Sequence, residues 1–367
     1  MMRKHRLLLL AIMLIAILVA SLTACNTMVY SEGLAYSVNA DGETCTITGI
    51  GTCIDTEISI PKEIDGYTVT AVAPSAFCNN NGITAVLIPD GVTMIGDSAF
   101  GGCCNLTSVI FGENSQLTTI GDGAFIGCSS LTSITIPNGV TIIGNQAFEV
   151  CGIFRSIEIP DSVTCIGECA FKGCFNLTGV TFGEDSQLTT IGKQAFWSCT
   201  ILANIEIPAT VTTIGVEAFA GCHDLIVTLG ENSLLTTIGD GAFNGCSRLT
   251  SIKIPVNVTS IGNEAFARCT NLTSINIPDS VTGIGSCAFF DCASLTSINI
   301  PDSVTSIGSY AFSDCASLTS VTFEDPTGWY VTQTVGATSG TDLTLTDAST
   351  NATYLKSTYG YYYWYKS

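Results

Sequence analysis

The dipeptide Ala-Phe recurs along most of the chain, and this recurrence constrains the fold more than any other feature. Tandem repetition with a period of about 20 to 50 residues is typical of solenoid proteins, in which every repeat forms one coil. The chain is therefore expected to form one elongated array of eleven coils. The repeat phenylalanines, spaced by 23 to 25 residues, are Phe77, Phe100, Phe125, Phe148, Phe171, Phe196, Phe219, Phe243, Phe266, Phe289 and Phe312.

One full repeat, LTSITIPNGVTIIGNQAFEVC at residues 131–151, shows how a coil is expected to fold. Its alternating, β-branched segment 134–136 predicts a short strand that ends at Pro137. Gly144 suits the backbone of a second bend, after which residues 145–148 are expected to return the chain through a tight turn or one helical turn. The few apolar side chains of one coil cannot offset the entropy of ordering it, so the coils must stack with their strands about 4.8 Å apart.

The repeat also matches a known template. The inward pattern L-x-x-I-x-I-x-x-x-V at residues 131–140 closely follows the leucine-rich repeat, with valine near the place where Asn or Cys is usual. The longer pattern IPxxVTxIGxxAFxxCxxLTSI resembles the BspA-like leucine-rich repeat family of bacterial and protist surface proteins over about residues 60–323, and residues 45–77 resemble the beginning of that family's array. The resemblance implies a β-rich solenoid of the α/β leucine-rich-repeat type. This would be a single elongated right-handed array with one short parallel strand per 23-residue coil and with terminal caps.

Three repeats depart from the pattern in the same way. They replace Ile-Pro by FGENSQL at residues 111–117, FGEDSQL at 182–188 and LGENSLL at 229–235, each with two extra residues. These segments predict longer loops on one edge of the array. The third repeat also lacks one strand residue, which predicts a local irregularity near His223.

The N-terminus has the pattern of an export signal. Basic residues precede an apolar run at residues 7–19, which is short for a membrane helix of about 20 residues. Residues 22–25, Leu-Thr-Ala-Cys, resemble the bacterial lipobox, which implies cleavage before Cys25 and lipid attachment to that cysteine. The alternative is an ordinary secretory signal with a chance cysteine. The predicted division is a lipoprotein signal peptide at 1–24, an N-terminal linker and cap at 25–60, the solenoid at 61–323 and an aromatic-rich C-terminal cap at 324–367.

The two ends of a solenoid need caps, because open strand edges invite aggregation. Residues 324–367 lose the repeat but contain DLTLT and the aromatic cluster YGYYYWYKS. A capping β segment is one interpretation. The other is an aromatic platform for stacking sugars or a partner, formed by Trp329, Tyr361, Tyr362, Tyr363 and Trp364.

Cysteine occupies the third place after the repeat phenylalanine in ten consecutive coils, whereas the first coil has Asn80 there. One cysteine per coil forms a line rather than a converging zinc site. Disulfides between neighbours would need Cβ atoms closer than the strand spacing, so we expect a ladder of free, space-filling thiols. The ladder is Cys103, Cys128, Cys151, Cys174, Cys199, Cys222, Cys246, Cys269, Cys292 and Cys315.

The other cysteines have separate interpretations. Cys45 and Cys53 flank TITGIGT and could bridge a hairpin, although free thiols are equally compatible with the sequence. Cys165, Cys169 and Cys174 form the only metal-like cluster, but Cys174 belongs to the ladder, so we expect no metal site. Cys287 and Cys169 share a variable place in the repeat, and we expect this place to be exposed.

Catalysis and nucleic-acid binding are not expected. The sequence has 31 acidic and 12 basic residues and no basic stripe, which disfavours a phosphate backbone as ligand. After removal of the signal the net charge is 9 − 31 = −22, and His223 is the sole histidine, at a variable repeat position. Acidic side chains repeated along a rod form a stripe rather than a converging pair, and no cofactor motif such as a phosphate loop occurs.

The outward strand positions are short hydroxyls with occasional charges. They suit either a soluble sheet face with Thr and Ser pairs or an extended binding face. The candidate binding face is Thr132, Ser133, Thr135, Glu158, Glu206, Lys253 and Asn276.

The expected function combines these points. Resemblance to the BspA-like family implies a lipid-anchored cell-surface protein, tethered to the membrane through Cys25, that adheres to an extracellular protein or polysaccharide such as host matrix or another cell. A structural envelope lipoprotein without a dedicated ligand is the alternative.

Overall fold

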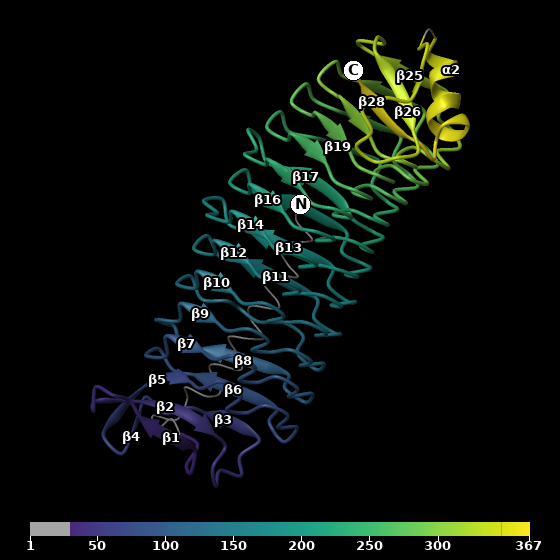
Figure 1. The fold of residues 1–367 in the computed structure, drawn as a ribbon. Helices are drawn as coiled ribbons and strands as arrows, with labels where there is room; N and C mark the ends of the chain where they lie inside the picture. Colours follow the sequence, from purple (N-terminus) through teal and green to yellow (C-terminus); the bar gives the residue numbers. More distant parts are fainter. Residues whose placement is uncertain (1–29, 346) are drawn as a thin grey trace.

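A computed structural model describes residues 30–345 and 347–367. It is a β-solenoid of about 12 turns with coils of about 23 residues, which confirms the predicted fold class. Figure 1 shows the coils stacked along one axis, with the first described strands at one end of the rod and the C-terminal helix at the other. Among the described residues no helix has the length and apolar character needed to cross a membrane.

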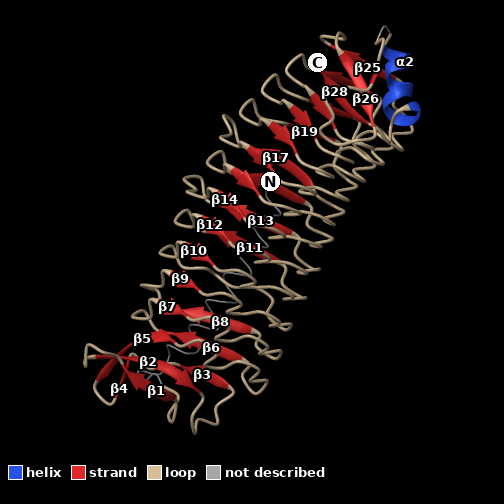
Figure 2. Cartoon of the chain, in the orientation of Figure 1, coloured by secondary structure: helices blue, strands red, loops and turns tan. Residues whose placement is uncertain are grey.

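Most coils contribute two short strands, whereas the sequence predicted one (Figure 2). The predicted strand belongs to a set that we name the first strand ladder, and the unpredicted one to a second strand ladder. The first ladder consists of β3 (Glu57–Ser59), β6 (Ala85–Ile88), β8 (Ser108–Phe111), β11 (Ser156–Ile159), β13 (Gly179–Phe182), β15 (Asn204–Ile207), β17 (Ile226–Leu229), β19 (Ser251–Lys253), β21 (Ser274–Asn276), β23 (Ser297–Ile300) and β25 (Ser320–Phe323).

The second strand ladder runs unbroken through the array. It consists of β5 (Tyr67–Val72), β7 (Met94–Ile95), β9 (Thr119–Ile120), β10 (Ile142–Ile143), β12 (Cys165–Ile166), β14 (Thr190–Ile191), β16 (Thr213–Ile214), β18 (Thr237–Ile238), β20 (Ser260–Ile261), β22 (Gly283–Ile284) and β24 (Ser306–Ile307). Most of these strands have two residues, one exposed or half-buried and one buried isoleucine. Two residues cannot show alternation, and for that reason the sequence pattern did not reveal the strand.

The first ladder is interrupted, and three interruptions follow the coils with extra residues. After 111–117, residues 131–136 form no strand, although Ile134 and Ile136 are buried like their counterparts. After 182–188, β13 pairs with β15 only at one position. After 229–235, β17 has no pairing with β19, one coil beyond His223. A further break, between β21 and β23, follows a coil of ordinary length.

The core is a stack of identical side chains from successive coils. The eleven repeat phenylalanines are buried, with neighbouring ring centroids 5.1–5.6 Å apart and ring planes within 15° of parallel. Stacking of apolar groups at this spacing provides the burial that a lone coil lacks.

The cysteine ladder is buried and its thiols are free, as predicted. Each of the ten thiols also donates to the backbone carbonyl of the repeat phenylalanine in the preceding coil, at Sγ to O distances of 3.1–3.4 Å. Cysteine at this position therefore fills space and satisfies a buried carbonyl that would otherwise have no second donor.

The glycine that follows each second-ladder isoleucine has a role different from the predicted one. Gly144 has no positive φ, so the turn that follows it does not depend on the backbone freedom of glycine. A Cβ there would lie 2.6 Å from the backbone carbon of Gly121, so glycine is required because adjacent coils approach closely. The left-handed backbone occurs two residues before and two residues after the repeat phenylalanine, at non-glycine residues such as Gln146 and Val150.

The N-terminal cap closes both ladders. β1 (Ala35–Val38) pairs antiparallel with β2 (Thr44–Gly49), which lies parallel to β5, and β4 (Glu63–Ile64) pairs antiparallel with β5. On the first ladder, the backbone N–H of Ser31 donates to the carbonyl of Ser59 in β3 at 2.9 Å. An antiparallel strand at the end of a parallel ladder covers edge groups that would otherwise be open.

The C-terminal cap closes the other end of the rod. Its elements are β26 (Trp329–Thr332), β27 (Thr341–Asp342), α2 (Ala348–Thr353), the π-helical turn η1 (Tyr354–Thr358) and β28 (Tyr363–Lys366). β28 pairs antiparallel with β24 and β26. The side chain of Asn351 in α2 donates to the carbonyl of Val321 in β25 at 3.1 Å, so the helix covers the end of the first ladder.

Candidate binding face on the first strand ladder

The predicted binding-face residues lie on one side of the first ladder or in its equivalent segment 131–136. Strand alternation places successive side chains on opposite faces, and here the isoleucines are buried while their neighbours are exposed. The exposed members are Thr132, Ser133, Thr135, Glu158, Glu206, Lys253 and Asn276.

Strand register aligns several of these side chains in a row across the ladder. Glu158 pairs with Thr181, and Glu206 pairs with Thr228. The single pairing of Gly179 with Asn204 places Thr181 beside Glu206. The two carboxylates are therefore two strands, or about 10 Å, apart. They form part of a stripe rather than a closely spaced acid and base pair.

A hollow of about 610 Å³ lies on this face over β13, β15 and β17. Half-buried Phe182, Pro208 and Ala209 line it together with Asn204, Glu206 and Thr228. Its position follows from coil length. The coil that contains β15 has the short Ile-Pro connection, whereas both neighbouring coils have longer loops, whose residues Glu184 and Gly230 border the hollow.

A second, shallower depression of about 290 Å³ lies further along the ladder, over β19 and β21. Lys253 and Asn276 line it together with Ser251 and Ser274. The face thus offers a carboxylate at one hollow and an ammonium group at the next, separated by the break between β17 and β19.

The aromatic platform predicted at the C-terminus is wrong for its two tryptophans. Trp329 and Trp364 are buried against Phe323, with ring centroids 5.2 and 6.2 Å from its ring. They form the core of the cap because β26 and β28 turn them toward the last coil. Tyr362 and Tyr363 are half-buried, and Tyr361 is exposed.

The remaining candidate residues do not converge. His223 is exposed, and its Nδ1 lies 3.0 Å from the carbonyl oxygen of Gly245. Within residues 30–345 and 347–367, no three His, Cys, Asp or Glu side chains gather as metal ligands would. Cys45 and Cys53 are both free thiols, and Cys25 lies outside the described residues.

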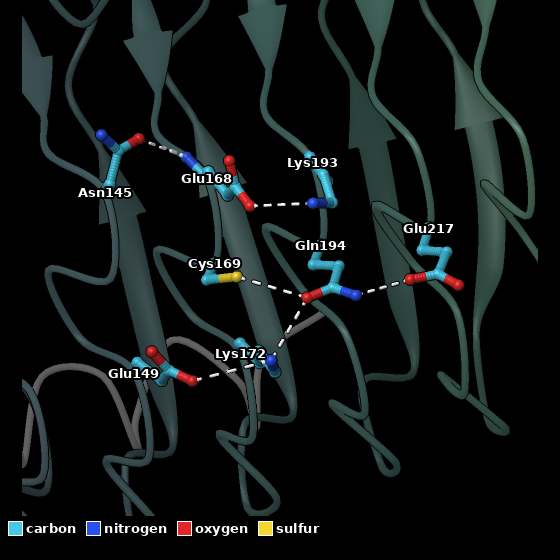
Figure 3. Close-up of polar contacts among 8 residues, drawn as sticks. All are labelled: Asn145, Glu149, Glu168, Cys169, Lys172, Lys193, Gln194 and Glu217. Atoms are coloured by element: carbon cyan, nitrogen blue, oxygen red, sulfur yellow. Dashed lines mark hydrogen bonds and ion pairs between the residues drawn. The ribbon is translucent and has the colours of Figure 1, made fainter.

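The predicted exposure of the place shared by Cys169 and Cys287 is wrong for Cys169. Cys287 is half-buried, whereas Cys169 is only 5% exposed. Its thiol donates to Oε1 of Gln194 at 3.4 Å, in a polar cluster that covers it from the next coil (Figure 3). The side chains of the neighbouring coils, which the repeat pattern does not specify, decide the difference.

Sequence reasoning missed an apolar group outside both ladders. Five large apolar side chains on three neighbouring coils are 36–48% exposed. Their positions follow the repeat phenylalanine by one, two, four or five residues. In the other coils these positions mostly hold small or polar residues, and this departure from the repeat pattern is the sequence signal that could have revealed the group. They are Val150, Ile153, Phe175, Trp197 and Ile201.

Comparison with a protein-family model supports the repeat assignment. The model described as the BspA type leucine rich repeat region matches in six copies, over residues 52–155, 118–232 and 236–331. Comparison with curated protein sequences found no match.

Solved structures of bacterial leucine-rich repeat proteins are similar to this chain. A leucine rich cell surface protein from Faecalibacterium prausnitzii is 29% identical with a TM-score of 0.50, over 86% of this chain and 98% of that one. A leucine-rich repeat protein from Bacteroides ovatus is 26% identical with a TM-score of 0.49, over 80% and 88%. The pneumococcal vaccine antigen PcpA is 22% identical with a TM-score of 0.52, over 82% of each chain, a likeness of fold alone.

Proposed function

Because the chain belongs to the BspA-type leucine-rich repeat family of bacterial surface proteins, we propose that it binds an extended protein or polysaccharide ligand along its first strand ladder. The proposal rests on the hollow over β13, β15 and β17. Solenoids commonly use their extended surfaces for binding, and a ligand that follows the ladder would meet the same side-chain positions in successive coils.

The chemistry of the hollow supports a ligand with both apolar and hydrogen-bonding groups. Half-buried Phe182, Pro208 and Ala209 provide apolar surface, and Asn204, Glu206 and Thr228 provide donors and acceptors. A pocket with few polar groups over an apolar base can orient a ligand while excluding water. Either a sugar face or an extended peptide has this combination.

We also propose that Cys25 anchors the protein to the membrane by a lipid. The support is the lipobox-like sequence that precedes Cys25 after a basic and apolar leader. Mass spectrometry of the N-terminal peptide from native cells is expected to show a lipid-modified Cys25 as the first residue. An unmodified N-terminal peptide that starts at another residue would contradict the anchor without affecting the binding proposal.

The binding experiment screens a protein comprising residues 26–367 against matrix proteins, glycans and intact cells. Glu206→Gln removes the negative charge of the hollow, and Ala209→Trp fills it. Each substitution is expected to weaken binding of a ligand at least about tenfold. Asp314→Asn is the matched control, because Asp314 is an exposed acid outside both ladders. Equal loss in all three variants would place the ligand elsewhere on the rod.

A structural role without a ligand is the second candidate, and one observation favours it. Many exposed threonines donate their hydroxyl to a backbone carbonyl one coil earlier, as Thr107 does to Thr84 at 2.9 Å and Thr178 to Arg155 at 3.0 Å. The hydroxyl-rich surface therefore already stabilises the stack. A screen in which no matrix protein, glycan or cell binds would support this candidate.

A further inference from the structure

The side-chain amide of Gln194 receives two hydrogen bonds from the preceding coil (Figure 3). Lys172 Nζ donates to its Oε1 at 3.2 Å, and Cys169 Sγ donates to the same oxygen at 3.4 Å. On the other side, the Gln194 amide nitrogen donates to a carboxylate oxygen of Glu217 in the next coil. An amine, a thiol and a carboxylate thus surround one carboxamide carbon.

The amine has a base beside it. Lys172 Nζ lies 3.8 Å from Oε1 of Glu149, and the two side chains are 29% and 13% exposed. The ammonium group also lies over the ring of Trp197, 5.3 Å from its centroid. The ion pair between Lys193 and Glu168, one coil further along, is far more open, with side chains about half exposed. Sheltering from water favours reactions in which an ammonium and a carboxylate exchange a proton.

We propose that Lys172 and Gln194 form an isopeptide crosslink between adjacent coils. Glu149 accepts a proton from the Lys172 ammonium, and the free amine attacks the carboxamide carbon of Gln194. The attacking nitrogen then gives up a second proton and the bond between the carbon and Nε2 breaks. The proton held by Glu149 and this second proton both pass to the departing NH2 group, so ammonium is released and Glu149 is again a carboxylate. The step needs no oxidant or cofactor, because one amide replaces another.

The neighbouring side chains have defined parts in this reaction. Negative charge develops on Gln194 Oε1 during the attack, and the Cys169 thiol donates to that oxygen. Positive charge develops on the departing nitrogen, and the Glu217 carboxylate accepts its hydrogen bond. These contacts come from three successive coils, so the cluster exists only in the folded stack.

The crosslink does not depend on the proposed binding function. It would join the side chains of residues 172 and 194 covalently. Without it, only noncovalent contacts hold the side chains of these two coils together. A crosslink of this kind limits unfolding by constraining the unfolded chain. A rod exposed on a cell surface would therefore resist local unfolding and separation of these two coils.

The test is the intact mass of the purified full chain. The wild-type protein is expected to weigh less than its sequence mass, after allowance for signal processing, by the mass of one ammonia molecule. Trypsin should fail to cleave after Lys172, and the peptides that contain residues 172 and 194 should be recovered joined. Wild-type protein without this loss of mass would overturn the proposal.

Matched variants identify the bond. Lys172→Arg keeps the charge beside Glu149 but cannot form the amide, so it should retain the full mass, as should Glu149→Gln. The control is Lys193→Arg, because Lys193 is next to Gln194 in the sequence but pairs with Glu168. This variant should still lose ammonia. Loss of ammonia that persists in Lys172→Arg but disappears in Cys169→Ser would show a thioester and overturn the proposal. Thermal unfolding confirms that each variant is folded.

Discussion

The ladder cysteines show what one side chain per coil contributes. Each thiol fills a core position and donates to a phenylalanine carbonyl, so a residue that is larger or lacks a donor would disturb two coils at once. Burial also raises the pKa of the Cys174 thiol and of the Cys269 thiol to about 12, from an ordinary value of 9.0. These two thiols are therefore neutral and have little reactivity toward oxidants or metals at ordinary pH.

This pKa shift predicts loss of stability at alkaline pH. Between about pH 9 and about pH 12 the unfolded chain releases thiol protons that the folded chain retains, so the free energy of unfolding falls as the pH rises. The decrease is about 1.4 kcal/mol per pH unit for each such thiol, and below about pH 9 the full stability is present.

The measurement is chemical denaturation at about pH 8 and about pH 10. Cys174→Ala should unfold more readily at the lower pH, because it loses a buried contact, but its stability should fall less between the two pH values, by about 1.4 kcal/mol in total. Cys78→Ala is the control, since Cys78 is exposed. Equal pH dependence in the wild type and both variants would mean that the ladder thiols titrate normally.

Among the elements, the second strand ladder holds the coils together and the first varies. The second ladder is continuous, and all of its strands after β5 have two residues. The first ladder weakens after each coil with extra residues, since a longer connection displaces the next strand from register. The same difference in coil length produces the hollow at β15, so the irregular ladder is also the one with a shaped surface.

The close approach along the second ladder predicts a steric penalty at its glycines. In Gly215→Ala the new Cβ would lie 2.7 Å from the backbone carbon of Gly192, so the substitution should destabilise the protein by about 1–3 kcal/mol. Gly152→Ala is the matched control, because a Cβ there has no neighbour within 4 Å. Chemical denaturation of both variants checks this, and equal stabilities would show that the coils can separate without cost.

As a whole molecule, the rod depends on its two caps. Antiparallel strands cover both ends of the second ladder, and the C-terminal cap buries its own aromatic core against the last coil. Without a cap, the apolar face of the terminal coil and the open strand edge would be available to another chain.

The C-terminal cap is expected to fail when its central tryptophan is removed. Trp364→Ala should destabilise the cap by about 3–5 kcal/mol, because the buried indole stacks on Phe323 and donates to the carbonyl of Tyr359 at 3.1 Å. Size-exclusion chromatography with light scattering should then detect self-association of the rod. Tyr361→Ala, which removes a 45% exposed ring from the same segment, should leave the protein monodisperse or unchanged in oligomeric state.

The sequence by itself determined the solenoid, its period and its core. Each inward position recurs in successive repeats, so the pattern alone was enough to recognise it. Phe148 and Cys151 could be assigned to the core in this way, and Ile134 and Ile136 to the buried face of the strand. The outward residues of the binding face followed from the same alternation. The period also placed the longer loops, because extra residues between fixed positions can only enlarge a connection.

Only the tertiary structure decided what depends on contacts between neighbouring coils. The second strand is too short to have a pattern, and the role of Gly144 depends on the backbone of Gly121 one coil away. The burial of Trp364 and Cys169, the hollow around Glu206, and the meeting of Lys172 with Gln194 likewise depend on which side chains face each other across a coil boundary. A repeat pattern specifies the average coil, whereas these features come from the differences between one coil and the next.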